Sequence, residues 1–235
     1  TTAFLLCGIA SGIAFKGGMF NMGTEGQLYM GAISATLVGI YCKGLPAIAH
    51  IPLCMLAGMV AGAIWASIPA LLRVYWNTSE IVVTLMMNYI ATQLVAFFTI
   101  VWEVPKGSGK IGIINQDTNL GWLPQAFGSK YLLSIIVAAL VTLFMYVYLN
   151  FSKQGYEISV VGESENTAKY VGIKVEKVII RTMLLSGAVC GLVGLLLVGG
   201  INHTVTTTIA GGQGFTGVLV SWMSKFNPLT MVFSS

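Results

Sequence analysis

Four long uncharged runs, at 51–72, 81–101, 131–151 and 182–202, constrain this chain more than any other feature. A helix that crosses a bilayer needs about 20 mostly apolar residues, and each run meets that length. Backbone polar groups in lipid must be paired within the spanning structure, which leaves helices or closed barrels. We therefore predict an all-α fold, a polytopic transmembrane helical bundle in which residues 1–235 form a single transmembrane domain.

Two further stretches carry the same signal more weakly. The run 26–42 is shorter but also uncharged, and residues 1–15 have the character of the end of another span. The first residue is Thr1 rather than Met, and the chain closes at Ser235 just after a new apolar stretch begins. We expect the chain to be a piece of a longer membrane protein.

Composition supports a membrane protein and argues against other classes. Of the 235 residues, 56% are apolar and 9% are charged, against about 25% charged residues in an average soluble domain. These values exclude a disordered chain and a nucleic-acid partner, and they argue against an ordinary soluble enzyme. The four cysteines show no CxxC spacing, so we interpret them as small packing residues.

The sequence predicts no catalytic residue, no metal site and no cofactor. It contains no GxxxxGK[ST] phosphate loop, no HExxH pair and no GxSxG elbow. Residues 107–112 match GxGxxG by letters alone, without the strand and βαβ unit that a dinucleotide site needs. His50 and His203 are far apart in the chain and lack ligand spacing. We expect a protein without enzymatic activity of its own.

The charged residues orient the chain in the membrane. Nine of the 20 Lys, Arg, Asp and Glu residues lie in the segment 152–181. Because Lys and Arg near span ends favour the cytoplasmic side, we place this segment in the cytoplasm. Alternation of the spans then places Lys16 and the loop 73–80 inside, and the loops around Lys43 and at 102–130 outside.

Within the cytoplasmic segment, the sequence predicts a short helix over 163–171. Acidic residues lie in its first turn, Lys169 lies in its last turn, and Gly172 is a stop signal. A short helix between two spans suits docking to a soluble partner, although an ordinary surface helix shows the same pattern.

Polar side chains near the start of the run 26–42 form one candidate site. Asn21, Glu25 and Gln27 lie there, and an ionisable residue in or near the membrane is a functional candidate. Glu25 lines or gates a pathway for solute, or it caps a helix N-terminus, where the helix dipole favours a carboxylate. Asn88, inside another span, either bridges helices or contacts solute.

A short internal match predicts a second candidate site. Residues 26–31 and 212–217 both read GQxxxG, and alternation of the spans gives them opposite directions. Inverted repeats in transporters produce broken helices of opposite orientation, although three identities also arise by chance. The glycines of the second stretch predict a broken helix within the run 204–224, with a loop followed by a short span as the alternative. Gly212 and Gln213 are its candidate pathway residues.

Pairs of glycines four residues apart predict close helix crossings. These pairs are Gly8 with Gly12, Gly58 with Gly62, and Gly187 with Gly191. Each pair shares one helix face and lets another backbone approach closely. Glycine is also simply common in this chain, with 28 residues.

Several of these segments together resemble a known family. They are 20–27 (FNMGTEGQ), 80–90 (EIVVTLMMNYI), 162–172 (GESENTAKYVG), 212–217 (GQGFTG) and 227–229 (NPL). In this order, and over nearly the whole chain, they are similar to the permease subunits of bacterial ABC importers for nucleosides and simple sugars. The first stretch favours the nucleoside branch over the ribose branch, and it leaves the substrate open.

The resemblance implies partners and a mechanism. A second permease subunit, identical or different, would complete the membrane pathway, and ABC ATP-binding subunits would dock on the short helix predicted over 163–171, the coupling helix. An extracytoplasmic solute-binding protein would deliver the solute. The chain would lie in the bacterial plasma (inner) membrane, contact membrane lipid and work by alternating access. Permeases of this family have more spans than this chain. A secondary transporter or channel without an ATPase is the alternative, and the docking segment argues against it.

The polar residues and the resemblance together give two sets of candidate residues. The translocation pathway and its gate are expected at Asn21, Glu25, Gln27, Asn88, Gly212 and Gln213. Coupling to the ATPase is expected at Gly162, Glu163, Asn166, Ala168, Tyr170 and Gly172.

Overall fold

The computed structural model describes residues 2–42, 47–103, 106–107, 111 and 132–235. Its helices are α1 (Thr2–Lys16), α2 (Thr24–Tyr41), α3 (Ala47–Trp76), α4 (Glu80–Trp102), α5 (Leu132–Phe151), α6 (Lys153–Glu163), α7 (Glu165–Tyr170), α8 (Val175–Leu197), α9 (Gln213–Met223) and α10 (Pro228–Ser234). A π-helical turn, Val198–Asn202, follows α8. These ranges contain no β-strand, and Glu103 and Ile111 form an isolated bridge. The all-α prediction is confirmed. The outer loops predicted around Lys43 and at 102–130 lie largely outside the described residues.

Four described helices are long and apolar enough to cross a membrane. They are Ala49–Trp76, Glu80–Trp102, Leu132–Phe151 and Val175–Gly200, and they match the four predicted runs. α1 is a shorter apolar helix. Large apolar side chains are exposed along α3, α4 and α5, as expected for surfaces that contact lipid. The protein is therefore an integral membrane protein.

The last long helix begins earlier than predicted. α8 starts at Val175, whereas the predicted run was 182–202, so two basic residues lie inside the helix. Lys177 is exposed, and Arg181 pairs with Glu157 at 3.0 Å. Long basic side chains can carry their charge to water while their stems cover apolar surface. A charge near the end of a span therefore does not stop the helix.

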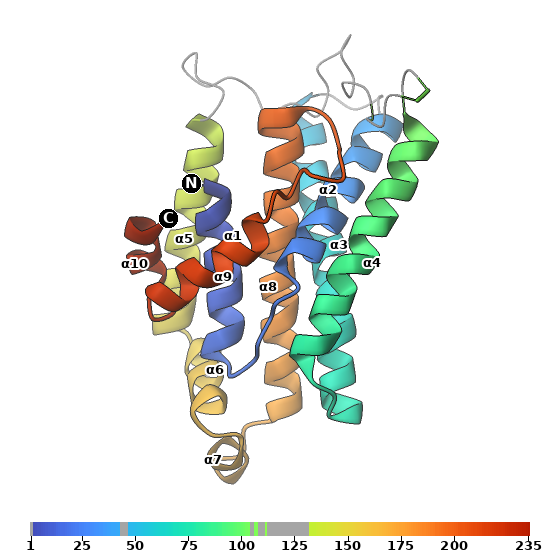
Figure 1. Ribbon diagram of the computed structural model, residues 1–235. Helices are drawn as coiled ribbons and strands as arrows, with labels where there is room; N and C mark the ends of the chain where they lie inside the picture. Colours follow the sequence, from blue (N-terminus) through green and yellow to red (C-terminus); the bar gives the residue numbers. More distant parts are fainter. Residues whose placement is uncertain (1, 43–46, 104–105, 108–110, 112–131) are drawn as a thin grey trace.

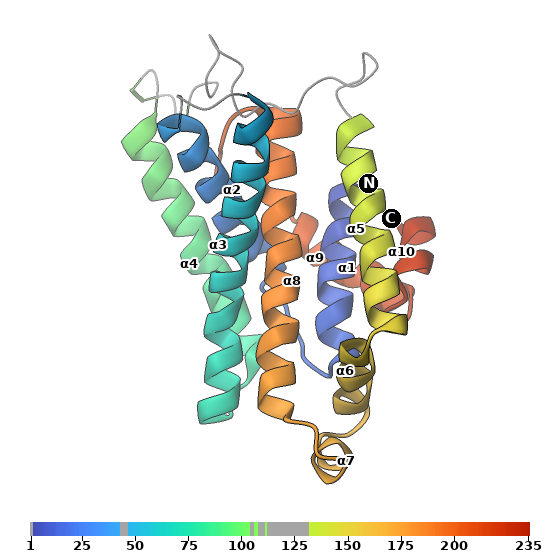
Figure 2. The same cartoon turned by 180° about the vertical axis from the view of Figure 1, so that it is seen from behind.

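α8 lies at the centre of the bundle. In its most apolar stretch 83% of the residues are buried, against 22–28% in α3, α4 and α5. α2 and α3 pack on one side of α8 and α1 packs on the other, while α4 and α5 lie at opposite edges (Figures 1 and 2). The core that positions the rest of the molecule is thus one helix surrounded by its neighbours.

The predicted crossing of α3 and α8 is confirmed. Gly187 and Gly191 of α8 lie against Gly58 and Gly62 of α3. A Cβ atom on Gly191 would lie 2.9 Å from the carbonyl carbon of Gly58 and 3.2 Å from the Cα atom of Gly62. The two backbones are in direct contact, closer than side chains at these positions would allow.

α1 and α9 cross in the same way. Gly8 and Gly12 of α1 face Gly217 and Ser221 of α9. A Cβ atom on Gly12 would lie 3.0 Å from Ser221 Oγ, and one on Gly217 would lie 2.9 Å from the backbone nitrogen of Gly8. All three predicted glycine pairs therefore lie at helix crossings.

The helix ends agree with the predicted alternation of the spans. The C-terminal ends of α1, α3 and α5 point to the end of the bundle that carries α6 and α7, at the bottom of Figure 1. Arg73 of α3 pairs there with Glu165 of α7, and Gly18, just after α1, contacts Gly162 of α6. We call this the cytoplasmic end, following the charge-based prediction.

The contact between α3 and α8 predicts that Gly191→Ala destabilises the protein. Its new Cβ atom would meet backbone atoms, which cannot rotate away, so we expect a loss of about 1–3 kcal/mol in the free energy of unfolding. Reversible unfolding in mixed micelles measures this loss. Ala188→Val is the matched control, because Ala188 lines an apolar cavity of about 300 Å³ between α3, α5 and α8. Equal stability of the two variants would contradict the backbone contact.

Candidate functional site

The segment between α1 and α2 brings polar side chains into the bundle. α1 ends at Lys16, Gly18 turns the chain with a φ of +75°, and α2 begins at Thr24. We call residues 17–23 the α1–α2 linker. Because this linker is not helical, the first backbone N–H groups of α2 have no partner within their own helix.

Asn21 ties the linker directly to α2 and α8 and, through Ser186, to α1. Its buried Nδ2 donates to Ser186 Oγ of α8 at 2.8 Å and to Gln27 Oε1 of α2 at 3.2 Å. Its Oδ1 accepts from Gln27 Nε2 at 3.1 Å and from the Gly23 N–H at 3.0 Å. Ser186 donates in turn to the carbonyl oxygen of Ala10 in α1 at 2.7 Å. Asn21 and Gln27, both predicted as pathway residues, are thus brought together inside the bundle.

Asn88 of α4 supports the first turn of α2. Its Oδ1 accepts from the Gly26 N–H and its Nδ2 donates to the carbonyl oxygen of Met22, each at 2.8 Å. Both backbone groups lie where α2 leaves its linker and lacks internal partners. Asn88 is buried and bridges helices, which is one of the two interpretations that the sequence left open.

Glu25 joins the start of α2 to the start of α9. It lies in the first turn of α2, but that helix has no side-chain cap. Its Oε1 instead accepts from the backbone N–H of Gly212, the N-cap residue of α9, at 3.3 Å. A Cβ atom on Gly214 would lie 2.6 Å from the backbone nitrogen of Glu25, so a glycine is required where the two helix starts meet. Glu25 therefore caps a helix other than its own.

A non-helical segment at membrane depth leads to α9. After the π-helical turn, His203 has a left-handed backbone with a φ of 51°, and residues 203–212 descend along the bundle (Figure 1). The Tyr29 hydroxyl of α2 donates to the carbonyl oxygen of Thr207 in this segment at 2.7 Å. Both α2 and α9 begin near mid-height and run toward opposite ends (Figure 1). The inverted repeat itself stays a prediction.

The position of this break corrects the prediction for the run 204–224. The helix begins at Gln213, so Gly214 and Gly217 lie inside α9 and serve close contacts rather than the break. α9 has 11 residues and is too short to cross a bilayer, which also rules out the alternative of a loop and a short span. Gly211 and Gly212, which have left-handed backbones with φ of 51° and 74°, do lie in the break directly before α9, as the run of glycines predicted.

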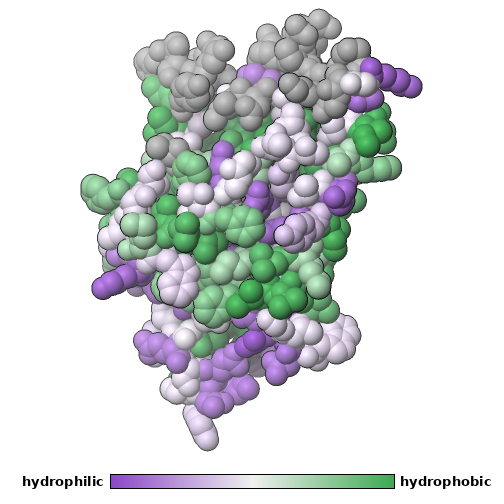
Figure 3. Space-filling model, viewed as in Figure 1, coloured by the Kyte–Doolittle hydropathy of each residue, from purple (hydrophilic) through white to green (hydrophobic). Residues whose placement is uncertain are grey.

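The face that carries these helix starts mixes polar and apolar groups. Figure 3 shows hydrophilic residues at mid-height of this face, with apolar residues around them. Thr207, Thr208 and Thr216 are exposed, and Glu25 and Gln213 are half-buried. Polar and ionisable groups at this depth are costly in hydrocarbon, so this face must contact water, solute or another protein.

Three buried polar atoms beside the helix starts have no hydrogen-bond partner among the described residues. They are Thr24 Oγ1, Trp65 Nε1 and Gln213 Oε1. Trp65 lies beside the first turn of α2, where a Cβ atom on Gly26 would be 3.2 Å from its Nε1. An unpaired buried polar group costs about 1–3 kcal/mol. The region therefore has unused capacity to hydrogen-bond a polar molecule.

The predicted cytoplasmic segment contains two helices rather than one. Ser152 Oγ caps α6 by accepting from the Gly155 N–H at 3.0 Å, and Ser164 Oγ caps α7 by accepting from the Thr167 N–H at 3.3 Å. Glu163, which we predicted in the first turn of the short helix, is instead the last residue of α6. The acidic pattern conceals the boundary because it runs through Ser164 without a break.

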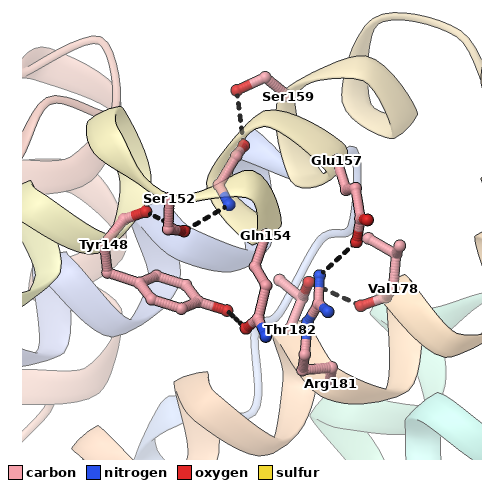
Figure 4. A network of polar contacts seen from close by, with 9 residues as sticks. Tyr148, Ser152, Gln154, Glu157, Ser159, Val178, Arg181 and Thr182 are labelled. Carbon is pink, nitrogen blue, oxygen red and sulfur yellow. Dashed lines mark hydrogen bonds and ion pairs between the residues drawn. The ribbon is translucent and has the colours of Figure 1, made fainter.

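Polar contacts attach α6 to both neighbouring spans (Figure 4). The Tyr148 hydroxyl of α5 donates to Gln154 Oε1 at 2.7 Å. Arg181 Nη2 of α8 donates to Glu157 Oε2 at 3.0 Å. α6 is thus held between the helix that enters the segment and the helix that leaves it.

The predicted coupling residues lie in different surroundings. Five of them are exposed: Gly162, Glu163, Asn166, Tyr170 and Gly172. The Tyr170 side chain, at 92%, is almost fully exposed on α7, whereas Ala168 is buried. Gly162 packs on the α1–α2 linker, where its Cβ atom would lie 3.2 Å from the backbone nitrogen of Gly18. α7 therefore presents a surface to solvent, while the end of α6 contacts the linker.

An ion-pair network at the cytoplasmic end was not predicted. Arg73 contacts Glu80 at 2.8 Å and Glu165 at 3.2 Å. Glu80 also accepts from the Phe20 N–H of the linker at 3.4 Å. A basic residue that ends one span and an acidic residue that starts the next would have indicated the first pair. Glu165 gives no such signal, because it lies far along the chain.

The arrangement offers hydrogen bonding and charge rather than covalent chemistry. Within the described ranges, no three His, Cys, Asp or Glu side chains are close enough to hold a metal ion. Two helix N-termini, which carry partial positive charge, meet beside the Glu25 carboxylate. The site is therefore suited to binding and passing a polar molecule.

Asn88→Ala should destabilise the start of α2. It leaves the Gly26 N–H and the Met22 carbonyl without this partner, and we expect a loss of about 1–2 kcal/mol in the free energy of unfolding. Thr92→Ala is the control on the same helix, because the Thr92 hydroxyl donates to a carbonyl oxygen within α4. Reversible unfolding compares the two variants, and an equal effect would show that Asn88 does not support the helix start.

Comparisons with known proteins give closely related sequences. Residues 1–235 match the family described as branched-chain amino acid transport system / permease component. The guanosine ABC transporter permease protein NupP of Bacillus subtilis (strain 168) is 35% identical over 100% of this chain and 68% of its own length. The glucose ABC transporter permease protein TsgB13 of Haloferax volcanii is 30% identical over 94% of this chain and 60% of its own length. The nucleoside ABC transporter permease protein NupB of Lactococcus lactis is 27% identical over 98% of this chain and 66% of its own length.

The extent of these matches decides the family. The chain spans 60–68% of the length of these three relatives. No solved structure matches the chain. Because the family match covers every residue, and because one relative is 35% identical over the whole chain, the protein belongs to the branched-chain amino acid transport system / permease component family.

Proposed function

We propose that this chain forms the translocation pathway of an ATP-driven ABC importer for nucleosides or simple sugars. Relatives named for guanosine, nucleosides and glucose support this class of solute. The observation that carries the proposal is the meeting of the N-termini of α2 and α9 beside Glu25, on an exposed face at membrane depth. Irregular backbone at this depth is tolerated where it is covered by protein or lines a water-filled cavity.

The groups at this meeting point suit uncharged solutes with many hydroxyl groups. Helix N-termini offer N–H donors, and Glu25 offers a carboxylate acceptor. Thr207 and Thr208 expose hydroxyls that both donate and accept, and Gln213 has an amide oxygen without a partner among the described residues. Nucleosides and sugars can exchange hydrogen bonds with each of these groups.

The six candidate pathway residues divide into two roles in this proposal. Glu25, Gly212 and Gln213 face the solute. Asn21, Gln27 and Asn88 are buried and hydrogen-bonded, so they hold the start of α2 in place without contacting the solute. Burial supports the division, because an internal side chain with paired atoms has little to offer a passing molecule.

The partners follow from the exposed surfaces. A second permease subunit, identical or different, would cover the polar face and complete the pathway. ABC ATP-binding subunits would dock on α7 and the end of α6, where Asn166 and Tyr170 of α7 and Glu163 of α6 are exposed near the cytoplasmic end. A solute-binding protein would deliver solute at the opposite end. ATP hydrolysis would occur in the separate subunits, and the complex would lie in the bacterial plasma membrane.

ATP-dependent uptake tests this proposal. Proteoliposomes would contain the full-length subunit, the ATPase and the binding protein encoded beside it, with ATP inside or omitted. We expect uptake of labelled guanosine or labelled glucose that requires ATP. Uptake that persists without the ATPase would indicate a secondary transporter instead, and failure to take up either solute would refute the proposed solute class.

Glu25→Ala should reduce ATP-dependent uptake about tenfold or more. It removes the carboxylate that this proposal places beside the solute, and a hydrogen bond to a charged group is worth roughly 1.5–3 kcal/mol. Glu25→Gln keeps an acceptor and should retain part of the uptake. Asn150→Ala, at an exposed position near the end of α5 where the side chain bonds only to its own helix, is the control and should leave uptake unchanged. If Glu25→Ala lowers thermal stability but not uptake per folded subunit, Glu25 only caps α9.

A further inference from the structure

A bridge of ion pairs connects three helices at the cytoplasmic end. Arg73, in the last turn of α3, uses Nη1 to contact Glu80 Oε2 at 2.8 Å and Nη2 to contact Glu165 Oε1 at 3.2 Å. One guanidinium therefore joins the end of α3, the start of α4 and the start of α7. Its planar fork presents separate nitrogens to separate carboxylates, which the single nitrogen of a lysine does not.

The bridge continues from Glu80 to the α1–α2 linker. Glu80 is only 7% exposed, and its second oxygen, Oε1, accepts from the Phe20 N–H at 3.4 Å. The next residue is Asn21, which is hydrogen-bonded to Gln27 in the first turns of α2 and to Ser186. A continuous series of contacts thus runs from α7 to the helix start that carries the proposed solute site.

The two ion pairs of Arg73 differ in how easily they open. The Glu80 side chain is 9% exposed, whereas that of Glu165 is 46% exposed and its contact is longer. Exposed pairs contribute little to stability, while a buried carboxylate that loses its partner is costly. A force on α7 would therefore break the contact with Glu165 first and leave Arg73 on Glu80.

α7 is joined to α6 through a single non-helical residue. The two helices meet at Ser164, which has an extended backbone with a φ of −163°. α6 is attached to α5 and α8, and Gly162 packs on the linker. Movement of α7 about Ser164 would therefore be passed to the α1–α2 linker through Arg73. α6 would stay in place and keep its contact with the linker.

We propose that Arg73 is a positioning residue that transmits movement of α7 to the start of α2 through Glu80 and the α1–α2 linker. This inference rests on the proposed function, because a docked ATPase is the source of the movement. When α7 moves away, Arg73 loses its ion pair with Glu165 and keeps only the one with Glu80. The hydrogen bond from the Phe20 N–H to Glu80 then changes as well. The two arrangements of one guanidinium provide the two-state element that coupling requires.

The first test measures uptake and ATP hydrolysis together in proteoliposomes of the full-length importer, with labelled guanosine and labelled glucose as probes. Glu165→Gln should lower the solute taken up per ATP hydrolysed about 3- to 10-fold. Arg73→Lys keeps a positive charge beside Glu80, and hence the fold, but should show a similar loss. The double variant should be no worse than either single variant, because both break the same link. Glu176→Gln, at an exposed carboxylate of α8 that forms no ion pair within the described chain, is the control.

The second test does not depend on transport. Amide hydrogen exchange of residues 17–27 would be compared with and without the ATPase, locked on by a non-hydrolysable ATP analogue. We expect docking to change exchange in the wild type and in Glu176→Gln, but not in Glu165→Gln. If Glu165→Gln responds like the wild type, or if the wild type does not respond, Arg73 does not transmit the movement. Absence of ATP-dependent uptake in the wild type would refute the proposed function, and the exchange result would still decide on Arg73.

Discussion

Two helices of this bundle, α2 and α9, begin inside the membrane, and their first backbone N–H groups need partners there. The partner for α2 is an amide side chain, Asn88 of α4, and the partner for α9 is a carboxylate, Glu25 of α2. These requirements bring α4, the α1–α2 linker and the segment before α9 to one place. The region where α2 and α9 begin is polar because lipid cannot form hydrogen bonds with the free N–H groups of a helix start.

The starts of α2 and α9 can meet because the helices of the bundle pack closely around α8. Glycines remove the side-chain layer between α3 and α8 and between α1 and α9, so the helices that carry the site approach within backbone contact. Gly214 serves the same purpose at the meeting point itself, against Glu25. The close packing of the helices and the meeting of the two helix starts thus both depend on glycine, which has no Cβ atom, at a few positions.

Local patterns predicted much of this structure. The spans, their alternation and the glycine crossings depend on composition and spacing, and Asn21 and Glu25 stand out as polar residues beside an apolar run. Their partners could not be predicted, because Asn21 bonds to Ser186, 165 positions away, and Glu25 bonds to Gly212, 187 positions away. The boundary between α6 and α7 was missed because the capping role of Ser164 is hidden among acidic residues. The sequence identifies groups that need partners, and the fold decides which partners they find.

The capping of α9 by Glu25 and of α2 by Asn88 has a consequence for biosynthesis. A membrane protein is made from its N-terminus, so α2 leaves the ribosome before α4, which supplies the partner for its first turn. Until α4 arrives, the backbone groups at Gly26 and Met22 must be solvated by water or by the insertion machinery. α9, made after both, finds its acceptor already in place. The first turn of α2 therefore gains its side-chain partner only after α4 has been made, whereas the acceptor for α9 is made before α9 itself.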